Sequence, residues 1–142
     1  MPNRTIAALV ALCGLGFAAT AHADDSRIRY RCGAEGANDI SMSAKYETRA
    51  SRRKFSVEFE AAPAAGFADG DKLGVRVDGT AVGSVTLGAI RGGDVVGDLN
   101  YDTKPTEDDA DPFPAKFPKT LGRGAKIRLS QGDKKVLACE LR

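Results

Sequence analysis

Histidine is almost absent from this chain of 142 residues, and its one copy, His22, lies near the N-terminus. Arg4, the apolar run from Ile6 to Ala19 and the small residues of Ala21-His22-Ala23 together predict a signal peptide, residues 1–23, that is removed after export. The exported chain then contains no histidine. Ser-His and Cys-His nucleophile systems and imidazole metal sites are therefore excluded from it.

Cysteine is scarce as well. Cys13 lies in the predicted signal peptide, where the preceding Leu12 disfavours lipid attachment, and Cys32 and Cys139 remain near the two ends of the exported chain. Disulfides form in the compartments that exported proteins enter, so we predict a bond between these two residues. It would close a loop of roughly 100 residues, which the chain-entropy model values at about 4 to 5 kcal/mol. With both thiols bonded, thiol chemistry is excluded too.

A second long apolar run is also missing, since no other stretch approaches the ~20 apolar residues of a membrane span. We therefore predict a periplasmic or secreted protein without membrane insertion, whose residues 24–142 form a single domain. The exported chain has 20 Lys and Arg against 19 Asp and Glu. This balance favours no nucleic-acid partner, and no glycine-rich loop follows a strand and opens a helix, so no cofactor is predicted.

Apolar and polar residues alternate along most of the exported chain. Ile28, Tyr30 and Cys32 alternate with arginines, and the same period of two recurs along the chain up to Leu141. Turn signals such as Asp78-Gly79 separate these segments. The pattern predicts an all-β protein, an antiparallel β-sandwich or small barrel of about seven to nine short strands, tied by one disulfide.

The most acidic stretch, residues 98–111, allows two interpretations. Asp98, Asn100 and Asp102 have the spacing of the first liganding positions of an EF-hand loop, which makes them a weak calcium candidate. The alternative is a strand that turns Leu99 and Tyr101 inward and the acids toward water. The run from Glu107 to Asp111 is typical of a solvated loop.

No catalytic residues are predicted. The remaining chemistry would be that of a carboxylate-based hydrolase, which needs two acids facing each other across a cleft, one of them in an apolar setting. Glu47, Glu58 and Glu60 instead occupy outward positions in charged strands. The sequence therefore predicts a protein that is not an enzyme.

Two features indicate contact with a partner. In PFPAKFP, residues 112–118, Phe113 and Phe117 either fill the core or leave one ring exposed as a partner contact. The second feature is a basic run beside the turn at Ser51, which either contacts an acidic polymer or lipid headgroup or provides solubility and edge protection. It consists of Arg49, Arg52, Arg53 and Lys54.

The segments SAKYETRASRRKFSVEFEAAP, KLGVRVDGTAVGSVTL, DLNYD and PFPAKFP resemble a group of small exported bacterial proteins, each a single all-β module of unassigned activity. More weakly, residues 41–46 are similar to the Ser- and Lys-bearing loop of periplasmic c-type lysozyme inhibitors, which implies partner contacts at Ser43 and Lys45. We predict a non-enzymatic envelope binding or structural module whose partner is an envelope protein. The alternative is an inhibitor of a lysozyme-type cell-wall hydrolase.

Overall fold

The protein is all-β in the parts that the structure, a computed structural model, describes: residues 26–106 and 109–142. The predicted signal peptide, residues 1–23, and Glu107 and Asp108 of the acidic run lie outside the described residues. Nine strands and one 3-10 turn are described, in agreement with the predicted number of strands. They are β1 (Arg27–Gly36), β2 (Ile40–Arg49), β3 (Arg52–Ala61), η1 (Pro63–Ala65), β4 (Lys72–Val77), β5 (Thr80–Thr86), β6 (Gly88–Ala89), β7 (Val95–Asp102), β8 (Lys126–Gln131) and β9 (Lys134–Glu140).

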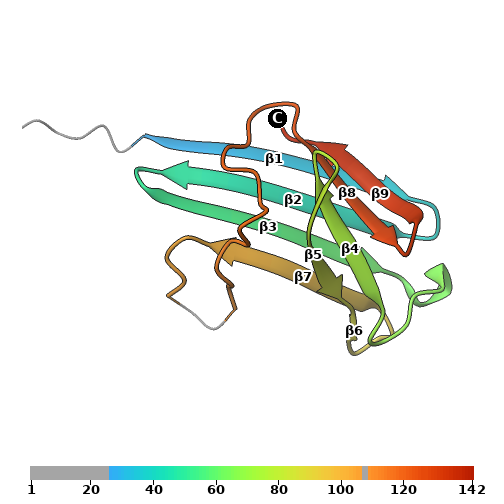
Figure 1. The fold of residues 1–142 in the computed structure, drawn as a ribbon. Coiled ribbons are helices and arrows are strands. Elements are labelled where there is room, and N and C mark those ends of the chain that lie inside the picture. Colours follow the sequence, from blue (N-terminus) through green and yellow to red (C-terminus); the bar gives the residue numbers. More distant parts are fainter. Residues whose placement is uncertain (1–25, 107–108) are drawn as a thin grey trace, which may run out of the picture.

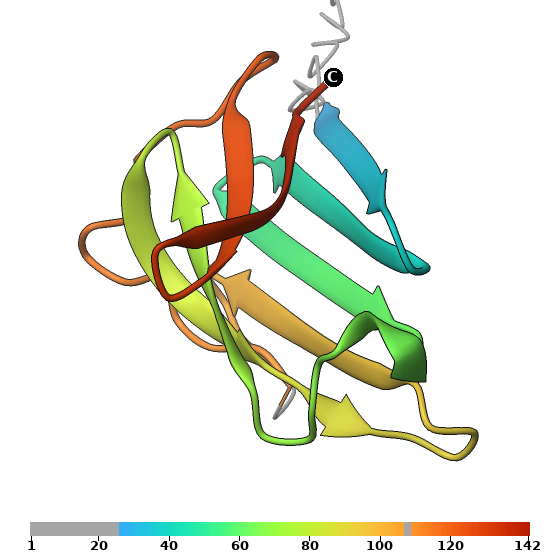
Figure 2. The same cartoon turned by 90° about the vertical axis from the view of Figure 1, so that its right-hand side faces the viewer.

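The strands form two antiparallel sheets that pack as two layers. Sheet A has the order β1-β2-β3-β7-β6 and sheet B the order β5-β4-β8-β9. Figure 1 shows that sheet B covers only one half of sheet A. Figure 2 shows the same two layers in a view turned by 90°. The predicted antiparallel sandwich is therefore confirmed. In Figure 1 the segment between β7 and β8 passes in front of the other half of sheet A.

Short turns fix the register of the strands. Asp78 and Gly79 join β4 to β5 with φ of 47° and 83°, the left-handed backbone that a type I′ hairpin turn needs at both central positions. Ala50 and Ser51 join β2 to β3, and Arg49 consequently pairs directly with Arg52. Since side chains alternate between the two faces of a sheet, this register decides which residues share a face.

The core lies between the sheets and is apolar, with Phe55, Val57, Leu73 and Ile127 at most 1% exposed. Tyr101 of β7 reaches across it, and its hydroxyl donates a hydrogen bond of 2.7 Å to the carbonyl oxygen of Val82 in β5. The following residue is Gly83, and a Cβ at this position would overlap with the Tyr101 hydroxyl. Glycine thus allows the two sheets to approach here. Burial, together with the charge of Asp111, raises the pKa of Tyr101.

The predicted disulfide is present and joins the two sheets. Cys32 of β1 is bonded to Cys139 of β9, with 5.7 Å between the Cα atoms. Next to it, the backbone N–H of Arg31 donates to the carbonyl oxygen of Arg142 at 3.1 Å, and the N–H of Arg142 donates to the carbonyl oxygen of Arg31 at 3.0 Å. The C-terminal end of the chain is thereby held against the edge of sheet A.

The proline-rich segment covers the half of sheet A that sheet B leaves open. Phe117 is 4% exposed, and its ring centroid lies 5.0 Å from that of Phe55 and 4.8 Å from that of Phe113. Phe113 is only partly buried, under the guanidinium of Arg53. Phe117 therefore fills the core, Phe113 is the more accessible of the two rings, and a partner contact at either ring stays a prediction.

Candidate binding face

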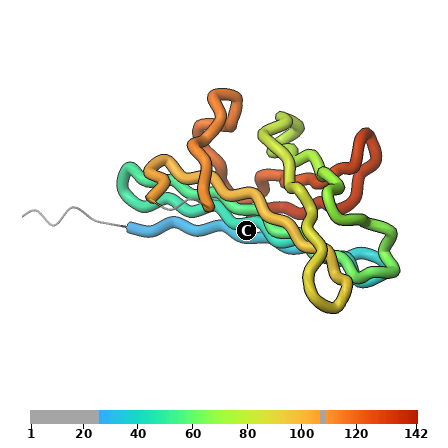
Figure 3. The backbone as a smooth tube through the Cα atoms, turned by 90° about the horizontal axis from the view of Figure 1, so that it is seen from below, coloured from blue at the N-terminus to red at the C-terminus, as the bar shows by residue number. Residues whose placement is uncertain are grey.

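The outer face of sheet A is the surface that faces away from sheet B. In Figure 3 sheet B and the segment between β7 and β8 both rise from the same side of sheet A. Within the described residues, no segment crosses the opposite side, and most side chains there are exposed. We call this surface the outer face; it carries residues 27, 29, 31, 33 and 35 of β1 and the residues that pair with them in β2, β3 and β7.

Cations gather at one end of the outer face. The register places Arg27 opposite Arg49, Arg49 opposite Arg52, and Arg31 opposite Lys45. Like charges directly opposite each other destabilise a sheet. We call this end the basic pole; it consists of Arg27, Arg29, Arg31, Lys45, Arg49, Arg52 and Lys54.

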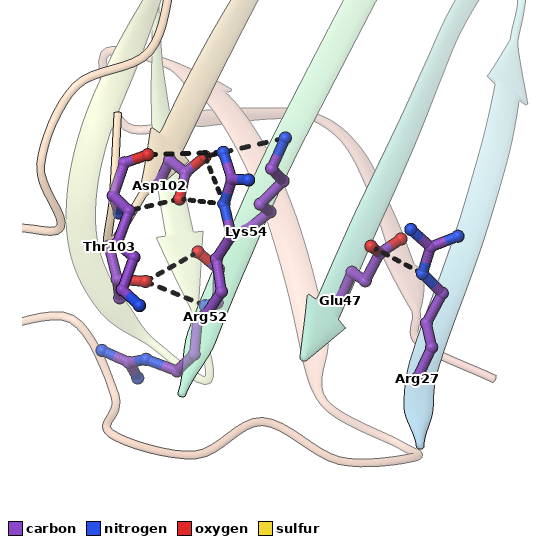
Figure 4. A network of polar contacts seen from close by, with 8 residues as sticks. Arg27, Glu47, Arg52, Lys54, Asp102 and Thr103 are labelled. Carbon is purple, nitrogen blue, oxygen red and sulfur yellow. Dashed lines mark hydrogen bonds and ion pairs between the residues drawn. The ribbon is translucent and has the colours of Figure 1, made fainter. Parts of the chain in front are cut away.

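Glu47 is one of two carboxylates within the basic pole. Its carboxylate forms ion pairs with Arg27 (Nε to Oε1, 3.0 Å) and with Arg29 (Nη2 to Oε2, 2.7 Å). Figure 4 shows Glu47 on β2 with Arg27 on β1 beside it. Burial raises the pKa of Glu47, but the hydrogen bond from Arg29 and the nearby positive charges outweigh this effect, so the pKa is lowered overall. Glu47 therefore stays ionised and compensates part of the positive charge.

Asp102, at the end of β7, is the second carboxylate and is 3% exposed. The Arg52 guanidinium contacts both of its oxygens, at 2.6 Å and 3.1 Å, and the Lys54 ammonium lies 3.6 Å away. The backbone N–H of Lys104 donates a further hydrogen bond of 2.9 Å. Figure 4 shows this group between β3 and β7. The hydrogen bond from Arg52 outweighs burial, and the pKa of Asp102 is lowered.

The substitution Asp102→Asn is expected to lower the free energy of unfolding at pH 7 by roughly 1.5 to 3 kcal/mol, because charge-assisted hydrogen bonds are lost. A carboxyl whose folded pKa is depressed stabilises the fold above its unfolded pKa, about 3.9, and loses this effect as the pH falls through the folded value. The difference between wild type and variant should therefore shrink below about pH 4. Urea unfolding from pH 7 to about pH 3 measures this difference.

The matched control is Glu140→Gln, which removes an exposed carboxylate 3.8 Å from Lys126. An exposed ion pair contributes about 0 to 1 kcal/mol, so this variant should unfold nearly as the wild type does. A loss in the Asp102→Asn variant that stayed the same at every pH would contradict an ionised Asp102 held by Arg52.

Arg31 and Lys45 lie at the inner limit of the basic pole, and both are exposed. In the described part of the chain, neither is within ion-pair distance of a carboxylate. A depression of about 280 Å³ in the rest of the basic pole is lined by Arg27, Glu47, Arg49, Arg52 and Lys54, and not by Arg31 or Lys45.

The other end of the outer face is acidic. Glu58 lies directly opposite Asp98, which repeats with negative charge the like-charge pairing of the basic pole. Ser43 donates a hydrogen bond of 3.4 Å to Glu58, and Asn100 donates one to Asp98. Among the described residues, no cation forms an ion pair at this end. We call it the acidic pole; it consists of Glu35, Glu58, Glu60 and Asp98, and it borders a depression of about 450 Å³.

Three of the predicted contact residues, Ser43, Lys45 and Arg52, lie on the outer face. Arg53 points to the other side of sheet A: its guanidinium lies 4.7 Å from the centre of the Phe113 ring and donates to the carbonyl oxygens of Pro118 and Lys119. Arg53 thus holds the proline-rich segment in place. The segment of residues 41–46, which resembles an inhibitor loop, lies within β2, between β1 and β3, and not in a loop. The inhibitor function stays a prediction.

The calcium candidate has the geometry of a strand. Asp98, Asn100 and Asp102 follow one another along β7 on the outer face. The ligands of a calcium loop converge at a tight turn, whereas alternate residues of a strand are about 7 Å apart, and Asn100 donates a hydrogen bond to Asp98. Calcium binding here stays a prediction. Within residues 26–106 and 109–142, no group of three or more His, Cys, Asp or Glu side chains is placed to hold a metal ion.

Sequence reasoning noticed the alternating arginines of residues 27–31 but did not include them in a site. The signal that could have placed these arginines in a site is the length of the turns between the strands. Because Ala50 and Ser51 alone join β2 to β3, Arg49 must pair with Arg52, and counting outward places Lys45 opposite Ser56. The pairing of β1 with β2 then adds Arg31 beside Lys45.

Comparison of the chain with protein-family models, with curated proteins and with solved structures finds no match. A proposal for the function therefore depends on the two sheets and the charged outer face alone. No helix in the described part of the chain is long and apolar enough to cross a membrane.

Proposed function

We propose that the protein is a non-enzymatic binding module of the cell envelope, periplasmic or secreted, that holds an anionic polymer on its basic pole. The observation that carries the proposal is the pair Arg31 and Lys45, two exposed cations directly opposite each other with no carboxylate within ion-pair distance among the described residues. Opposite charges at these positions would favour the fold, whereas like charges oppose it. An anionic ligand would relieve this repulsion.

Solubility alone does not require this arrangement. A mixed surface of both signs keeps a small protein in solution, and such mixing is the usual pattern. Here the cations are separated from the acids along the strands, and of the described carboxylates only Glu47 and Asp102 form ion pairs with the cations of the basic pole. Separation of charge raises the electrostatic potential over one area, which attracts a ligand of the opposite charge.

The spacing of the cations suits an extended polymer. Neighbouring strands are about 4.8 Å apart, and successive outward residues of one strand are about 7 Å apart. Arg31 and Lys45 therefore form part of a twisted lattice in which charges repeat every 5 to 7 Å or so. A chain with regularly spaced phosphate, sulfate or carboxylate groups can contact several of these cations at once.

Calorimetric titration with sodium polyphosphate and with dextran sulfate tests the proposal. Arg31→Gln combined with Lys45→Gln should weaken binding roughly tenfold, because two ion contacts of up to about 1 kcal/mol each are lost. The dependence of log K on log salt concentration should also become shallower by about two. The substitutions remove two like charges that face each other across β1 and β2, so the variant should be at least as stable as the wild type.

The matched control is K134Q/K135Q, which removes two exposed lysines of β9 in sheet B and gives the same net charge. Binding by this variant should match the wild type. Equal losses in the two double variants would mean that only net charge matters and would contradict a site on the outer face. Binding to vesicles of anionic lipid without any binding to the polymers would contradict the polymer as ligand.

A further inference from the structure

The outer face carries both signs of charge at separate ends, which makes it complementary to itself. Arg31 and Lys45 have no carboxylate within ion-pair distance, and Glu58 and Asp98 have no cation, among the described residues. We propose that two copies of this chain pair through their outer faces, with the basic pole of each copy against the acidic pole of the other. This inference does not depend on binding of a polymer.

A two-fold axis produces this arrangement. If the axis lies in the interface and is perpendicular, at its midpoint, to the line that joins the pair Arg31 and Lys45 to the pair Glu58 and Asp98, it exchanges the two pairs. Arg31 and Lys45 of each copy then meet Glu58 and Asp98 of the other. Such an interface uses the same surface patch twice and closes after two copies. The complementary charges would fix the orientation, since the opposite orientation places cation on cation.

The available area is enough for a weak dimer. Five rows of outward residues on β1, β2, β3 and β7 extend over about 28 Å along the strands and about 15 Å across them. Each copy would therefore bury on the order of 500 Å², or roughly 1,000 Å² in total, which is the lower limit for a specific interface. The surface is highly charged, so the dimer should dissociate readily in salt.

Sedimentation equilibrium of the wild-type protein without any polymer is the first test. We expect a dimer at about 20 mM NaCl and a monomer at about 500 mM, where the Debye length falls below about 5 Å. A monomer at low salt throughout the concentration range up to solubility would overturn the proposal. A dimer that persists unchanged at high salt would overturn it as well, because its contacts would not be ionic.

Charge reversal places the contacts on the two poles. R31E/K45E and E58K/D98K should each be monomeric at low salt, because one pole is lost from both faces of the dimer. Mixed in equal amounts, the two variants should form a heterodimer, because one outer face is then acidic and the other basic. Dimerisation of each variant alone at the wild-type level would overturn the proposal, and so would the failure of the mixture to associate when both variants show wild-type circular dichroism.

Further arms separate this proposal from the polymer proposal. K134E/K135E changes charge on β9, away from the outer face, and should leave the dimer intact. If this variant were monomeric at low salt, the assignment of the interface would be overturned. E58Q/D98Q removes the acidic pole without adding a cation, keeps the basic pole, and should still bind polyphosphate while it is monomeric. If no form of the protein binds polyphosphate but the charge-swapped pair associates, the polymer proposal fails and self-association stands.

Discussion

The variant C32A/C139A is expected to lose about 4 to 5 kcal/mol of unfolding free energy, because its unfolded chain is no longer closed into a loop by a bond between residues 107 positions apart. The melting temperature should fall by roughly 15 to 20 °C for a domain of this size. The bond joins β1 of sheet A to β9 of sheet B, so its loss also removes a covalent tie between the two layers. Urea unfolding followed by circular dichroism measures the change.

A reducing agent provides the control for this prediction. Wild-type protein treated with dithiothreitol should unfold like the double variant, whereas the variant itself should not respond to the reagent. A loss below about 1 kcal/mol would mean that the bond adds little, against the range of about 2 to 5 kcal/mol usual for native disulfides of small domains. Free thiols at both positions in protein from its native compartment would show that the bond is not used there.

The second large effect is expected for Phe117→Ala, which should cost roughly 3 to 5 kcal/mol, as the loss of a buried aromatic side chain does. Phe117 is surrounded by the rings of Phe55, Tyr101 and Phe113, with centroid distances of 5.0, 5.9 and 4.8 Å. Its removal leaves a cavity where the proline-rich segment is attached to sheet A. Calorimetric or chemical unfolding measures the loss.

Phe113→Ala is the matched comparison because the same residue type lies four positions earlier in the same segment. Phe113 is only partly buried, and the substitution leaves the Phe117 side chain in place. We expect a loss of roughly 1 to 2 kcal/mol, which includes the cation–π contact with Arg53. If Phe113→Ala cost as much as Phe117→Ala, the assignment of Phe117 as the anchor of the segment would be wrong.

Most of the fold could be predicted from local signals. The alternation around Tyr46, Phe55 and Val57 has a period of two, and these residues are all at most 3% exposed in the structure. Asp78-Gly79 specified its hairpin because few other residues accept the left-handed backbone of that turn. Cys32 and Cys139 required no choice of partner once the third cysteine was assigned to the signal peptide.

The candidate site was harder to predict because it depends on which strands are neighbours. Glu58 and Asp98 are 40 positions apart, and only the pairing of β3 with β7 places them opposite each other. β4, β5 and β6 lie between β3 and β7 in the chain, and no local pattern specifies that β7 pairs with β3. Asp102 was assigned to a solvated or calcium-binding stretch for the same reason, since its partner Arg52 lies on the neighbouring strand.

The two faces of sheet A differ in role: the inner face packs against the core, and the outer face carries the candidate site. The inner face is apolar and is tied to sheet B by the core, the Tyr101 hydrogen bond and the disulfide. This leaves the outer face able to carry like charges that oppose folding, because the stability comes from the other side.

The most direct test of the outer face as the contact surface is an amide NMR titration, with sodium polyphosphate at low salt, of the 15N-labelled variant E58Q/D98Q, which keeps the basic pole and should not pair face to face. The account predicts that shift changes concentrate at the basic pole, above all at Arg31, Lys45 and their neighbour Ser56, while the amides of Lys134 and Lys135 do not move. Shift changes centred on β8 and β9, or none at saturating polymer, would contradict it.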